Sequence, residues 1–463
     1  MTIPFRPRAV TPVHLAIIGA GYVGLTAAAC MAESGHDVTC VEASPRRLGM
    51  LLEGVMPIYE PGLEEMVARN VALGRLRFTS DVAEAMRGTR HVLLCVGTPP
   101  RQDGTPDLTQ ISRAAREVAA QAASDLVLIV KSTVPPGTCE AIEILAGEAA
   151  RPGVSVHVAS NPEFLRESRA VEDFFNPDRI VVGSDDPGIG REIAELYPAG
   201  HPVVVCDRRS SELIKYAANT FLAVKISFAN EVAGLCELLG ADAEPVLRGV
   251  GLDSRIGTAF LRPGPGFGGS CLPKDLSGFL ATAESLGYTA PVAAAALAVN
   301  QRAPVAVVEK LEAALGPLAG RRIAVLGVAF KPGTDDTRDS PAIEVVRELA
   351  ARGAGVAVHD PMAAADGLPA VTMPTPLDAM AVADALVVAT GWPEYAAVEP
   401  ELARDAMAGT TLVDASGILD ADAWERAGFS VYGVGGGLPT SVRPVIWQPI
   451  TWATGAREPV AAG

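Results

Sequence analysis

The sequence is poor in the features that would link the chain to nucleic acid or to a membrane. Its 38 Lys and Arg residues stand against 54 Asp and Glu residues, which gives a net charge of −16. A nucleic-acid partner needs a clustered basic face, so this balance argues against one. No apolar run reaches the roughly 18 residues that cross a bilayer, and the first dozen residues show no signal peptide. We therefore expect a cytoplasmic protein that binds no membrane.

Cysteine and histidine are also scarce, with seven and six residues in a chain of 463. The cysteines are odd in number and scattered, and no Cys-x-x-Cys occurs. This pattern indicates neither a disulfide framework nor a zinc site, and we expect no metal. No histidine lies in the motifs described below, so lysine, aspartate and water must carry any proton transfer there.

What the sequence does contain is a repeated alternation of strand-like and helical segments. The strand-like runs lie at 14–18, 37–42, 91–96 and 126–130, and again at 322–326, 356–360, 385–390 and 411–414. Strands that alternate with helices predict parallel, doubly wound sheets. Strand patterns vanish from about 208 to 305, where we expect one helix from Ser210 or Ser211 and another from Pro291.

The predicted fold is therefore α/β, with two Rossmann-like doubly wound parallel-sheet domains joined by a central helical domain. We assign residues 1–207 to the first sheet domain, 208–305 to the helical domain and 306–463 to the second sheet domain. A helical connector with much apolar surface often forms a dimer interface, so we expect a homodimer.

The first strand leads into a Gly-x-Gly-x-x-Gly turn, and Glu42 ends the second strand 18 residues after the last glycine. These glycines permit a tight turn and let a pyrophosphate approach the helix N-terminus. Glu42 would accept hydrogen bonds from a ribose, which favours NAD over NADP, although Arg46 and Arg47 are near enough to accommodate a 2′-phosphate. A Rossmann domain for another ligand is the alternative. The predicted cofactor contacts here are Gly19, Gly21, Tyr22, Val23, Gly24, Glu42 and Arg47.

Two further loops follow later strands, at the sheet edge where parallel sheets place ligands. Gly97 and Thr98 lie in Val-Gly-Thr-Pro, after the run at 91–96. Thr133 lies in Lys-Ser-Thr-Val-Pro-Pro-Gly-Thr, after the run at 126–130. Taken singly, each loop could equally be a plain capped turn, and together they are candidate cofactor contacts.

The most reactive candidate is Cys271, which follows a glycine-rich segment over 264–269. Pro273 indicates the first turn of a helix, and Lys274 comes three residues after the thiol. A thiol at a helix N-terminus beside a lysine is expected to ionise more easily and to act as a nucleophile. Together with a hydride acceptor, such a thiol can oxidise an aldehyde through a covalent thioester.

Three pairs of polar residues share a spacing of four, which places each pair on one face of a helix. The pairs are Lys215 with Asn219, Cys271 with Asp275, and Glu163 with Glu167. The first pair suits an oxyanion clamp, and its apolar neighbours indicate partial burial. For the two glutamates we expect a helix capped by Asn161, with solvated carboxylates as the alternative to an acid–base pair.

Several motifs in fixed order make the chain resemble the UDP-glucose dehydrogenases within the UDP-glucose/GDP-mannose dehydrogenase family. The resemblance runs from about His14 to Gly433 and rests on GAGYVG, VGTP, KSTVPPGT, NPEFLRES, PDRIVVG, ELIKYAANTFLAVKISFANE, GLDSRIG, GPGFGGSCLPKD and AFKPGTDDTRDSP. It implies an NAD-dependent oxidation in two stages, which consumes two NAD+ and takes the primary alcohol of UDP-glucose to a carboxylate. The segment 174–181 looks more like the UDP-glucose branch than the GDP-mannose branch.

By resemblance, Cys271 would attack the C6 aldehyde, and oxidation of the thiohemiacetal would give a thioester that water releases. Lys215 and Asn219 would stabilise the developing oxyanion, and the other members of the catalytic set would position water and move protons. The catalytic set implied in this way is Cys271, Lys215, Asn219, Asp275, Thr133 and Glu163.

The resemblance also implies binding residues. Thr133, Glu167, Lys274 and Arg338 would join the cofactor contacts, and Arg255 would reach the site of the neighbouring subunit in a dimer. The implied substrate contacts are Glu163, Phe164, Leu165, Lys215, Asn219, Arg255, Phe267, Gly268, Phe330 and Lys331.

Two departures from the family pattern stand out. Asp414-Ala-Ser-Gly replaces the usual Asp-Gly-Arg-Asn, which removes an expected arginine, and Leu272 replaces a phenylalanine beside the thiol. A UDP-N-acetylhexosamine or GDP-mannose is an alternative substrate. A hydroxyacid dehydrogenase of the 6-phosphogluconate type would have no use for Cys271. A catalytically silent nucleotide-sugar-binding protein would show losses in the catalytic set, and the sequence shows none.

Overall fold

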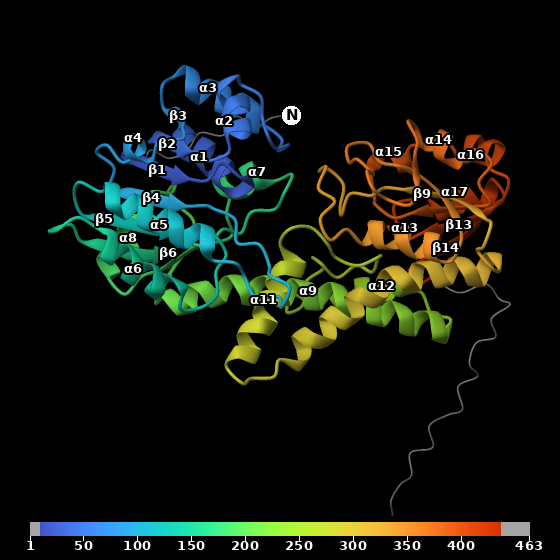
Figure 1. The fold of residues 1–463 in the computed structure, drawn as a ribbon. Coiled ribbons are helices and arrows are strands. Elements are labelled where there is room, and N and C mark those ends of the chain that lie inside the picture. The colour runs from blue at the N-terminus through green and yellow to red at the C-terminus, as the bar shows by residue number, and fades with distance from the viewer. Residues whose placement is uncertain (1–9, 437–463) are drawn as a thin grey trace, which may run out of the picture.

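The computed structural model describes residues 10–436, which form two sheet-containing lobes joined by long helices (Figure 1). The first lobe is built on an eight-stranded sheet and the second on a six-stranded sheet. The predicted α/β fold class, with two sheet domains and a helical region between them, is confirmed.

The first sheet has the strand order β3-β2-β1-β4-β5-β6-β7-β8. Neighbouring strands are parallel, except that β6 and β7, which the sequence patterns did not reveal, pair antiparallel. The strands are β1 His14–Ile18, β2 Asp37–Val41, β3 Leu76–Thr79, β4 His91–Leu94, β5 Leu126–Val130, β6 Val156–Ser160, β7 Ile180–Gly183 and β8 Val203–Cys206. The helices of this lobe are α1 Tyr22–Ser34, α2 Pro45–Leu52, α3 Leu63–Ala72, α4 Val82–Ala85, α5 Thr109–Gln121, α6 Thr138–Ala149, α7 Ala170–Phe175 and α8 Pro187–Ala194.

Helices cover both faces of this sheet, as a doubly wound fold requires. Leu25 of α1 and Phe174 of α7 belong to the buried cluster on one face. Ile111 of α5 and Ile142 of α6 belong to the cluster on the other. Because β5 is buried on both faces, it reads in the sequence as the uninterrupted apolar run Leu-Val-Leu-Ile-Val.

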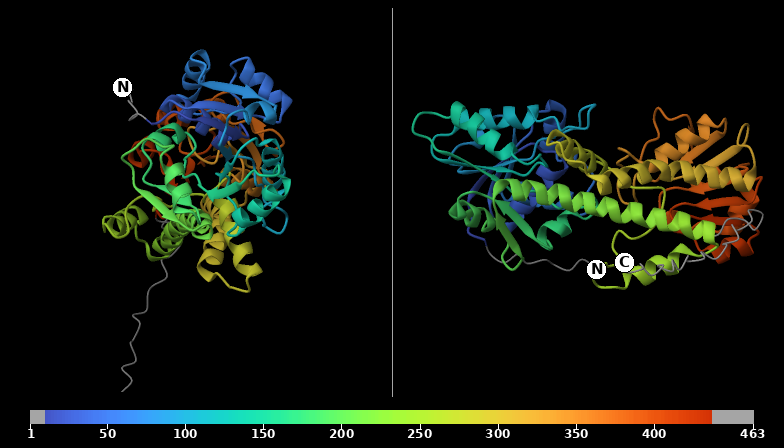
Figure 2. Two further views of the ribbon diagram at one scale, coloured as in Figure 1. Left: turned by 90° about the vertical axis from the view of Figure 1, so that its left-hand side faces the viewer. Right: turned by 90° about the horizontal axis from the view of Figure 1, so that it is seen from below.

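Two long helices connect the lobes, and Figure 2 shows them running alongside each other. The central helices are α9 Arg208–Leu239, α10 Ala243–Gly251, α11 Leu272–Ser285 and α12 Pro291–Leu315. Helix α9 is capped by Asp207, whose carboxylate accepts from the Ser210 N–H, so the predicted start at Ser210 or Ser211 is a few residues late. The predicted domain boundary at 305 falls inside α12, and the division into domains stays a prediction.

The second sheet has the order β11-β10-β9-β12-β13-β14, and all its neighbouring strands are parallel. Its strands are β9 Arg322–Leu326, β10 Gly355–His359, β11 Val371–Thr372, β12 Ala385–Val388, β13 Thr411–Asp414 and β14 Ser430–Gly433. Its helices are α13 Pro341–Ala351, α14 Pro376–Met380, α15 Pro393–Ala396, α16 Pro400–Ala406 and α17 Ala421–Arg426. Val307 and Val308 of α12 enter the core of this lobe.

By length and composition alone, helix α12 is long and apolar enough to cross a membrane, although polar and charged residues interrupt its apolar sequence. Core helices of globular proteins meet the same criterion. Here α12 packs against α9, α11 and α13. Its Lys310 side chain is 6% exposed and is paired with Glu237 of α9.

The turn between β1 and α1 depends on Gly24. A Cβ atom built on Gly24 would overlap the Gly19 carbonyl oxygen and lie 3.0 Å from Cys95 Cβ. Gly19 itself has a φ of 101°, which lies in the left-handed region. The start of helix α1 therefore lies tightly against the residues that follow β1 and β4, because side chains are missing at these positions.

We expect Gly24→Ala to lower the free energy of unfolding by at least about 2 kcal/mol, because the opposing atoms are backbone and cannot move aside. Thermal unfolding measures the effect. Gly49→Ala is the matched control, because a Cβ on Gly49, inside α2, meets no atom within 4 Å. Equal melting temperatures for the two variants would contradict this account of the turn.

Candidate active site

A cleft of about 1480 Å³ opens along the carboxyl ends of the first sheet's strands. Pockets for small molecules are typically about 300–1,000 Å³, so this cleft is large enough for a dinucleotide and more. Its walls come from both lobes and from the start of α11. The predicted residues that line it are Gly19, Gly21, Tyr22, Val23, Glu42, Arg47, Gly97, Thr98, Thr133, Glu163, Glu167, Cys271, Lys274 and Arg338.

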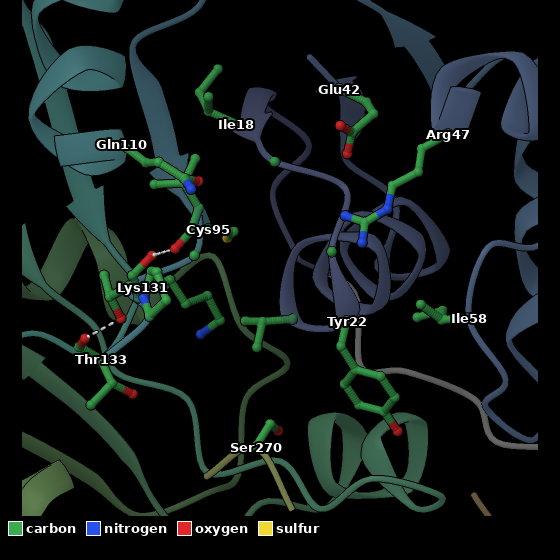
Figure 3. A pocket seen from close by; sticks show the side chains of 18 of the residues that line it. Ile18, Tyr22, Glu42, Arg47, Ile58, Cys95, Gln110, Lys131, Thr133 and Ser270 are labelled. Carbon is green, nitrogen blue, oxygen red and sulfur yellow. Dashed lines mark hydrogen bonds between the residues drawn. The ribbon is translucent and has the colours of Figure 1, made fainter. Parts of the chain in front are cut away.

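Glu42 lies at the end of β2 and is held by the backbone around it. Its Oε2 accepts from the Ala20 N–H at 3.1 Å and its Oε1 from the Ser44 N–H at 2.7 Å. Figure 3 shows Glu42 and Arg47 on one side of the cleft, with Tyr22 below them. A fixed carboxylate at this position, beside a glycine turn that side chains would fill, fits an adenosine ribose.

The loops after β4 and β5 form the opposite side of the cleft. Thr98 Oγ1 donates to the Thr133 carbonyl at 2.9 Å, and Ser132 Oγ donates to the Val96 carbonyl at 2.6 Å (Figure 3). The two loops that the sequence suggested separately are thus tied to each other. They hold Thr133 at the edge of the sheet, where it faces the cleft.

Lys215 and Asn219 extend from α9 into a buried cluster beside the cleft. The Lys215 ammonium lies 3.0 Å from Glu163 Oε1, and Asn219 Nδ2 donates to Asp275 Oδ2 at 2.6 Å. Lys274 Nζ donates to the other oxygen of Asp275 at 2.5 Å. The side chains of Lys215 and Asp275 are 4% and 1% exposed. The predicted burial of the Lys215–Asn219 pair is confirmed, and each of these polar groups has a partner.

The cluster keeps its charges in spite of its burial. Burial raises the pKa of the Glu163 carboxyl, but the Lys215 ammonium, a backbone N–H and the Lys131 ammonium together hold that pKa below its ordinary value. Burial lowers the pKa of Lys215. The interactions with Glu163, Asp275 and Cys271 raise it by more, so the pKa lies above its ordinary value. Lys215 is therefore a cation and Glu163 an anion at neutral pH.

Cys271 is the N-cap of α11, and Pro273 lies in the first helical turn as predicted. Burial raises the pKa of the thiol, and the Glu163 carboxylate raises it further, while Lys215 opposes both without overcoming them. The expectation that this thiol ionises easily is therefore wrong for the free protein. Lys274 does not relieve the cost of ionisation, because its ammonium turns to Asp275.

The segment 161–167 is a loop, so the helix predicted there is wrong, and α7 begins only at Ala170. The Asn161 side chain does not cap a helix. Its Nδ2 donates to the Val181 carbonyl at 2.8 Å, and its Oδ1 accepts from Lys131 Nζ at 3.3 Å. Tertiary partners thus hold the segment, and its two glutamates do not share a helix face.

Glu167 joins three parts of the chain. Its Oε1 accepts from Ser270 Oγ, next to the thiol, at 2.9 Å, and its carbonyl accepts from Lys331 Nζ of the second lobe at 2.6 Å. The Arg338 guanidinium lies 3.7 Å from the same Oε1. Burial raises the pKa of Glu167, and the nearby Asp336 carboxylate adds to this. Glu167 therefore lies where the two lobes meet the glycine-rich turn before Cys271.

The glycine-rich turn before Cys271 packs directly against the second lobe. A Cβ on Gly268 would overlap the Asp339 carbonyl oxygen, and one on Gly269 would come 2.7 Å from the Phe330 ring. The Gly269 N–H also donates to the Arg338 carbonyl at 2.9 Å. Residues with side chains could not make this approach.

Some predicted residues do not line the cleft. Arg255 is 86% exposed, and within residues 10–436 its one ion pair is with its neighbour Asp253, at 2.6 Å, away from the cleft lining. Phe267 is buried in the central cluster between α9 and α11. The predicted residues outside the cleft lining are Gly24, Phe164, Leu165, Lys215, Asn219, Asp275, Arg255, Phe267, Gly268, Phe330 and Lys331.

Sequence reasoning missed several residues around the cleft. Glu60, which is buried, accepts from the Tyr22 hydroxyl and from the Ala170 N–H at 2.7 Å. Lys131 and Tyr197 form a second buried contact, at 2.9 Å. Each is a lone polar residue with partners distant in sequence, so no spacing could have revealed it.

The loop that lacks the expected arginine is closed by Asp414. Its carboxylate accepts from Ser416 Oγ at 2.8 Å and from the Gly417 N–H at 2.7 Å. Arg262, from the segment before α11, donates to the Gly417 carbonyl. An arginine therefore reaches this loop from the central region rather than from the loop itself.

Comparison with known proteins matches all three regions of this chain to one family. Residues 13–200 match the NAD binding domain of the UDP-glucose/GDP-mannose dehydrogenase family, 209–302 its central domain and 324–421 its UDP binding domain. The UDP-glucose 6-dehydrogenase of Rhizobium meliloti is 45% identical, over 91% of this chain and 99% of its own length. That of Pseudomonas aeruginosa is 42% identical, over 91% and 97%.

Solved structures similar to this chain are also nucleotide-sugar dehydrogenases. A UDP-glucose dehydrogenase from Pyrobaculum islandicum matches with a TM-score of 0.86 and 41% identity, over 94% of this chain and all of its own. A UDP-N-acetyl-D-mannosamine dehydrogenase from Pyrococcus horikoshii matches with a TM-score of 0.82 and 29% identity, over 92% and 99%. With the three regions present in order and relatives matched along nearly their whole length, the chain belongs to the UDP-glucose/GDP-mannose dehydrogenase family and is an NAD-dependent oxidoreductase.

Proposed function

We propose that this enzyme oxidises UDP-glucose to UDP-glucuronate with two NAD+, through a thioester on Cys271. The observation that carries the proposal is that Cys271 and the glycine turn after β1 line one cleft. A nucleophile and a dinucleotide site that share one cleft suit the oxidation of an alcohol to an acid without release of the aldehyde. The identity of 45% to a UDP-glucose 6-dehydrogenase supports this substrate over others.

The residues of the first lobe fit the cofactor. Bound NAD+ supplies a nicotinamide ring that accepts a hydride in each of the two oxidations. The turn at Gly19, Gly21, Tyr22, Val23 and Gly24 admits the pyrophosphate to the N-terminus of α1. Glu42 accepts from the adenosine ribose, with Arg47 beside it. The remaining cofactor contacts that we propose are Gly97, Thr98, Thr133, Glu167, Lys274 and Arg338.

The first oxidation removes a hydride and a proton from the C6 alcohol and leaves an aldehyde. Cys271 Sγ, having lost its proton, then bonds to C6, and the carbonyl oxygen becomes an oxyanion. The Lys215 ammonium and the second Nδ2 hydrogen of Asn219 donate to that oxygen, because they are fixed in a buried cluster where such donors act most strongly. The oxygen then takes a proton, which gives the thiohemiacetal.

The second oxidation removes the C6 hydride and the hydroxyl proton and leaves a thioester. A water oxygen adds to C6, the C–S bond breaks, and the sulfur recovers a proton as the acid leaves. Thr133, Glu163 and Asp275 position this water, and the two carboxyl groups accept its protons. Glu163 is suited to this because its carboxylate stays ionised between two ammonium groups.

The nucleotide sugar lies between the thiol and the second lobe in this proposal. Lys331 is half-buried where its ammonium donates to the Glu167 carbonyl of the first lobe, and this partial burial lowers its pKa. Phe330 packs on the glycine turn beside the thiol. The substrate contacts that we propose are Glu163, Phe164, Leu165, Lys215, Asn219, Phe267, Gly268, Phe330 and Lys331, with Arg255 from a second subunit.

We also propose that the enzyme is a cytoplasmic homodimer. Helix α9 carries an exposed apolar stripe in which Phe221 and Phe228, seven residues apart, are 64% and 49% exposed. Leu235 continues the stripe at 56%. An exposed stripe of this kind on one helix face is typical of an association surface. Pairing through this stripe would bring Arg255, which does not line the cleft of its own chain, toward a second copy.

The substrate is tested by incubating the protein with NAD+ and, in separate reactions, UDP-glucose, GDP-mannose and UDP-N-acetyl sugars. We expect two NADH for each UDP-glucose consumed, because both oxidations occur before release. Absorbance of NADH and chromatography of the sugar nucleotides measure the ratio. One NADH per sugar would indicate a single-step dehydrogenase, faster turnover of another sugar would reassign the substrate, and no NADH would indicate a silent binding protein.

Cys271→Ser should lower the rate of acid formation by at least about 10³-fold, because loss of a covalent nucleophile removes the main catalytic route. We expect it to stall after the first oxidation or at a slow ester, which mass spectrometry of the quenched enzyme detects. Cys206→Ser, on β8 outside the cleft, is the matched control and should keep wild-type rates. Normal acid production by Cys271→Ser would exclude the thioester.

A Phe221→Asp, Phe228→Asp double variant should be monomeric, because charge on an apolar stripe opposes its burial. Light scattering after gel filtration gives the mass, and the activity should fall with the dimer. Leu402→Asp, a comparably exposed leucine on α16, is the control and should leave the mass unchanged. A wild-type chain that elutes as a monomer at micromolar concentration would contradict the dimer.

A further inference from the structure

Lys131 is a second buried ammonium beside the proposed reaction site, and it is not among the catalytic or binding residues proposed above. It follows β5 directly, its residue is 4% exposed, and it lines the cleft on the same side as Thr133 (Figure 3). Its Nζ donates to the Tyr197 hydroxyl at 2.9 Å and to Asn161 Oδ1 at 3.3 Å, with the Asn161 carbonyl at 3.5 Å. A lysine is rarely buried to this degree without a carboxylate to pair with.

The partners of this ammonium are all neutral. Within residues 10–436, no carboxylate forms an ion pair with Lys131. Tyr197 donates its own proton to Asn161 Oδ1, and Asn161 Nδ2 donates to the Val181 carbonyl of β7. Asn161 is thereby held by three elements of the first lobe, with its oxygens toward the ammonium. The network fixes the chain two residues before Glu163.

The charge of Lys131 also acts on Glu163. Lys215 from α9 and Lys131, directly after β5, are the two lysines that lower the pKa of this carboxyl. The other charged or titratable groups that interact with it are Arg179 before β7, Cys271 at the start of α11 and Cys95 after β4. Of these five groups, only Lys131 also holds the backbone that leads to Glu163.

We propose that Lys131 is a positioning residue of the reaction, which anchors the 161–163 segment through Asn161 and adds a positive charge that helps Lys215 to keep the Glu163 carboxylate ionised. This rests on the proposed function, in which Glu163 must be ionised to accept a proton from water. Lys131 itself touches neither the thiol nor the reacting carbon in this proposal. Its effect passes through Glu163.

The test is the pH dependence of kcat at saturating UDP-glucose and NAD+, for the wild type and Lys131→Gln, because Glu163 acts on the enzyme-bound intermediate. Activity is lost as the pH falls through the pKa of Glu163, because the protonated acid cannot accept a proton. Removing one cation raises that pKa, so the acid limb of Lys131→Gln should move to higher pH by about one unit. Lys131→Arg, which keeps the charge, should return the limb toward the wild-type position.

Tyr197→Phe is the matched control, because it removes the shortest hydrogen bond of the Lys131 ammonium and keeps the charge. It should lower the rate without moving the limb. If Lys131→Gln does not fold, Asn161→Asp is the substitute variant. A carboxylate beside the Lys131 ammonium offsets its positive charge at Glu163, so the acid limb should again move to higher pH.

An acid limb in Lys131→Gln that coincides with the wild-type limb would overturn the role of Lys131. An equal shift in Tyr197→Phe would overturn it too, because the effect would then come from loss of packing. Failure of the proposed function is distinguished by the wild type alone. A wild-type enzyme that makes no NADH from UDP-glucose would contradict the proposed function, whatever the variants do.

Discussion

The ion pair between Lys215 and Glu163 is the contact on which the rest of the site depends. It joins the central helix α9 to the loop after β6, and both side chains are almost fully buried. Burying two charges is costly unless each is paired and further hydrogen-bonded, and removal of one partner leaves an uncompensated charge. Asn219, one turn after Lys215 on α9, donates to Asp275 of α11 and so completes the cluster.

Around this pair, the cleft is assembled from segments that are far apart in the chain. The glycine turn after β1 and the loops after β4 and β5 provide one end, and the thiol turn before α11 provides the other. Glu167 closes the arrangement, because its carboxylate holds Ser270 while its carbonyl holds Lys331 of the second lobe. Glu167 therefore contributes both to the relative position of the lobes and to the position of the thiol.

Features that depend on neighbouring residues in the sequence could be predicted well. Features that depend on tertiary contacts could not. β5 could be predicted because a strand buried on both faces leaves an unbroken apolar run, and the Lys215–Asn219 pair could be predicted because both lie on one helix face. The helix expected from Asn161 does not form. Its start signals, an asparagine followed by a proline, are overridden by hydrogen bonds from Lys131 and to Val181. The acidity of Cys271 was misjudged for the same reason, since desolvation depends on the folded surroundings and not on adjacent residues.

The raised pKa of the Cys271 thiol has a consequence for the enzyme at rest. Peroxide and disulfide exchange attack the thiolate, so a thiol kept protonated by burial and by the nearby Glu163 carboxylate reacts slowly with both. The nucleophile of the free enzyme is therefore held mainly as the less reactive protonated thiol. We expect this slow reaction to spare the free thiol from oxidation, with burial as the larger cause and the Glu163 carboxylate as the smaller one.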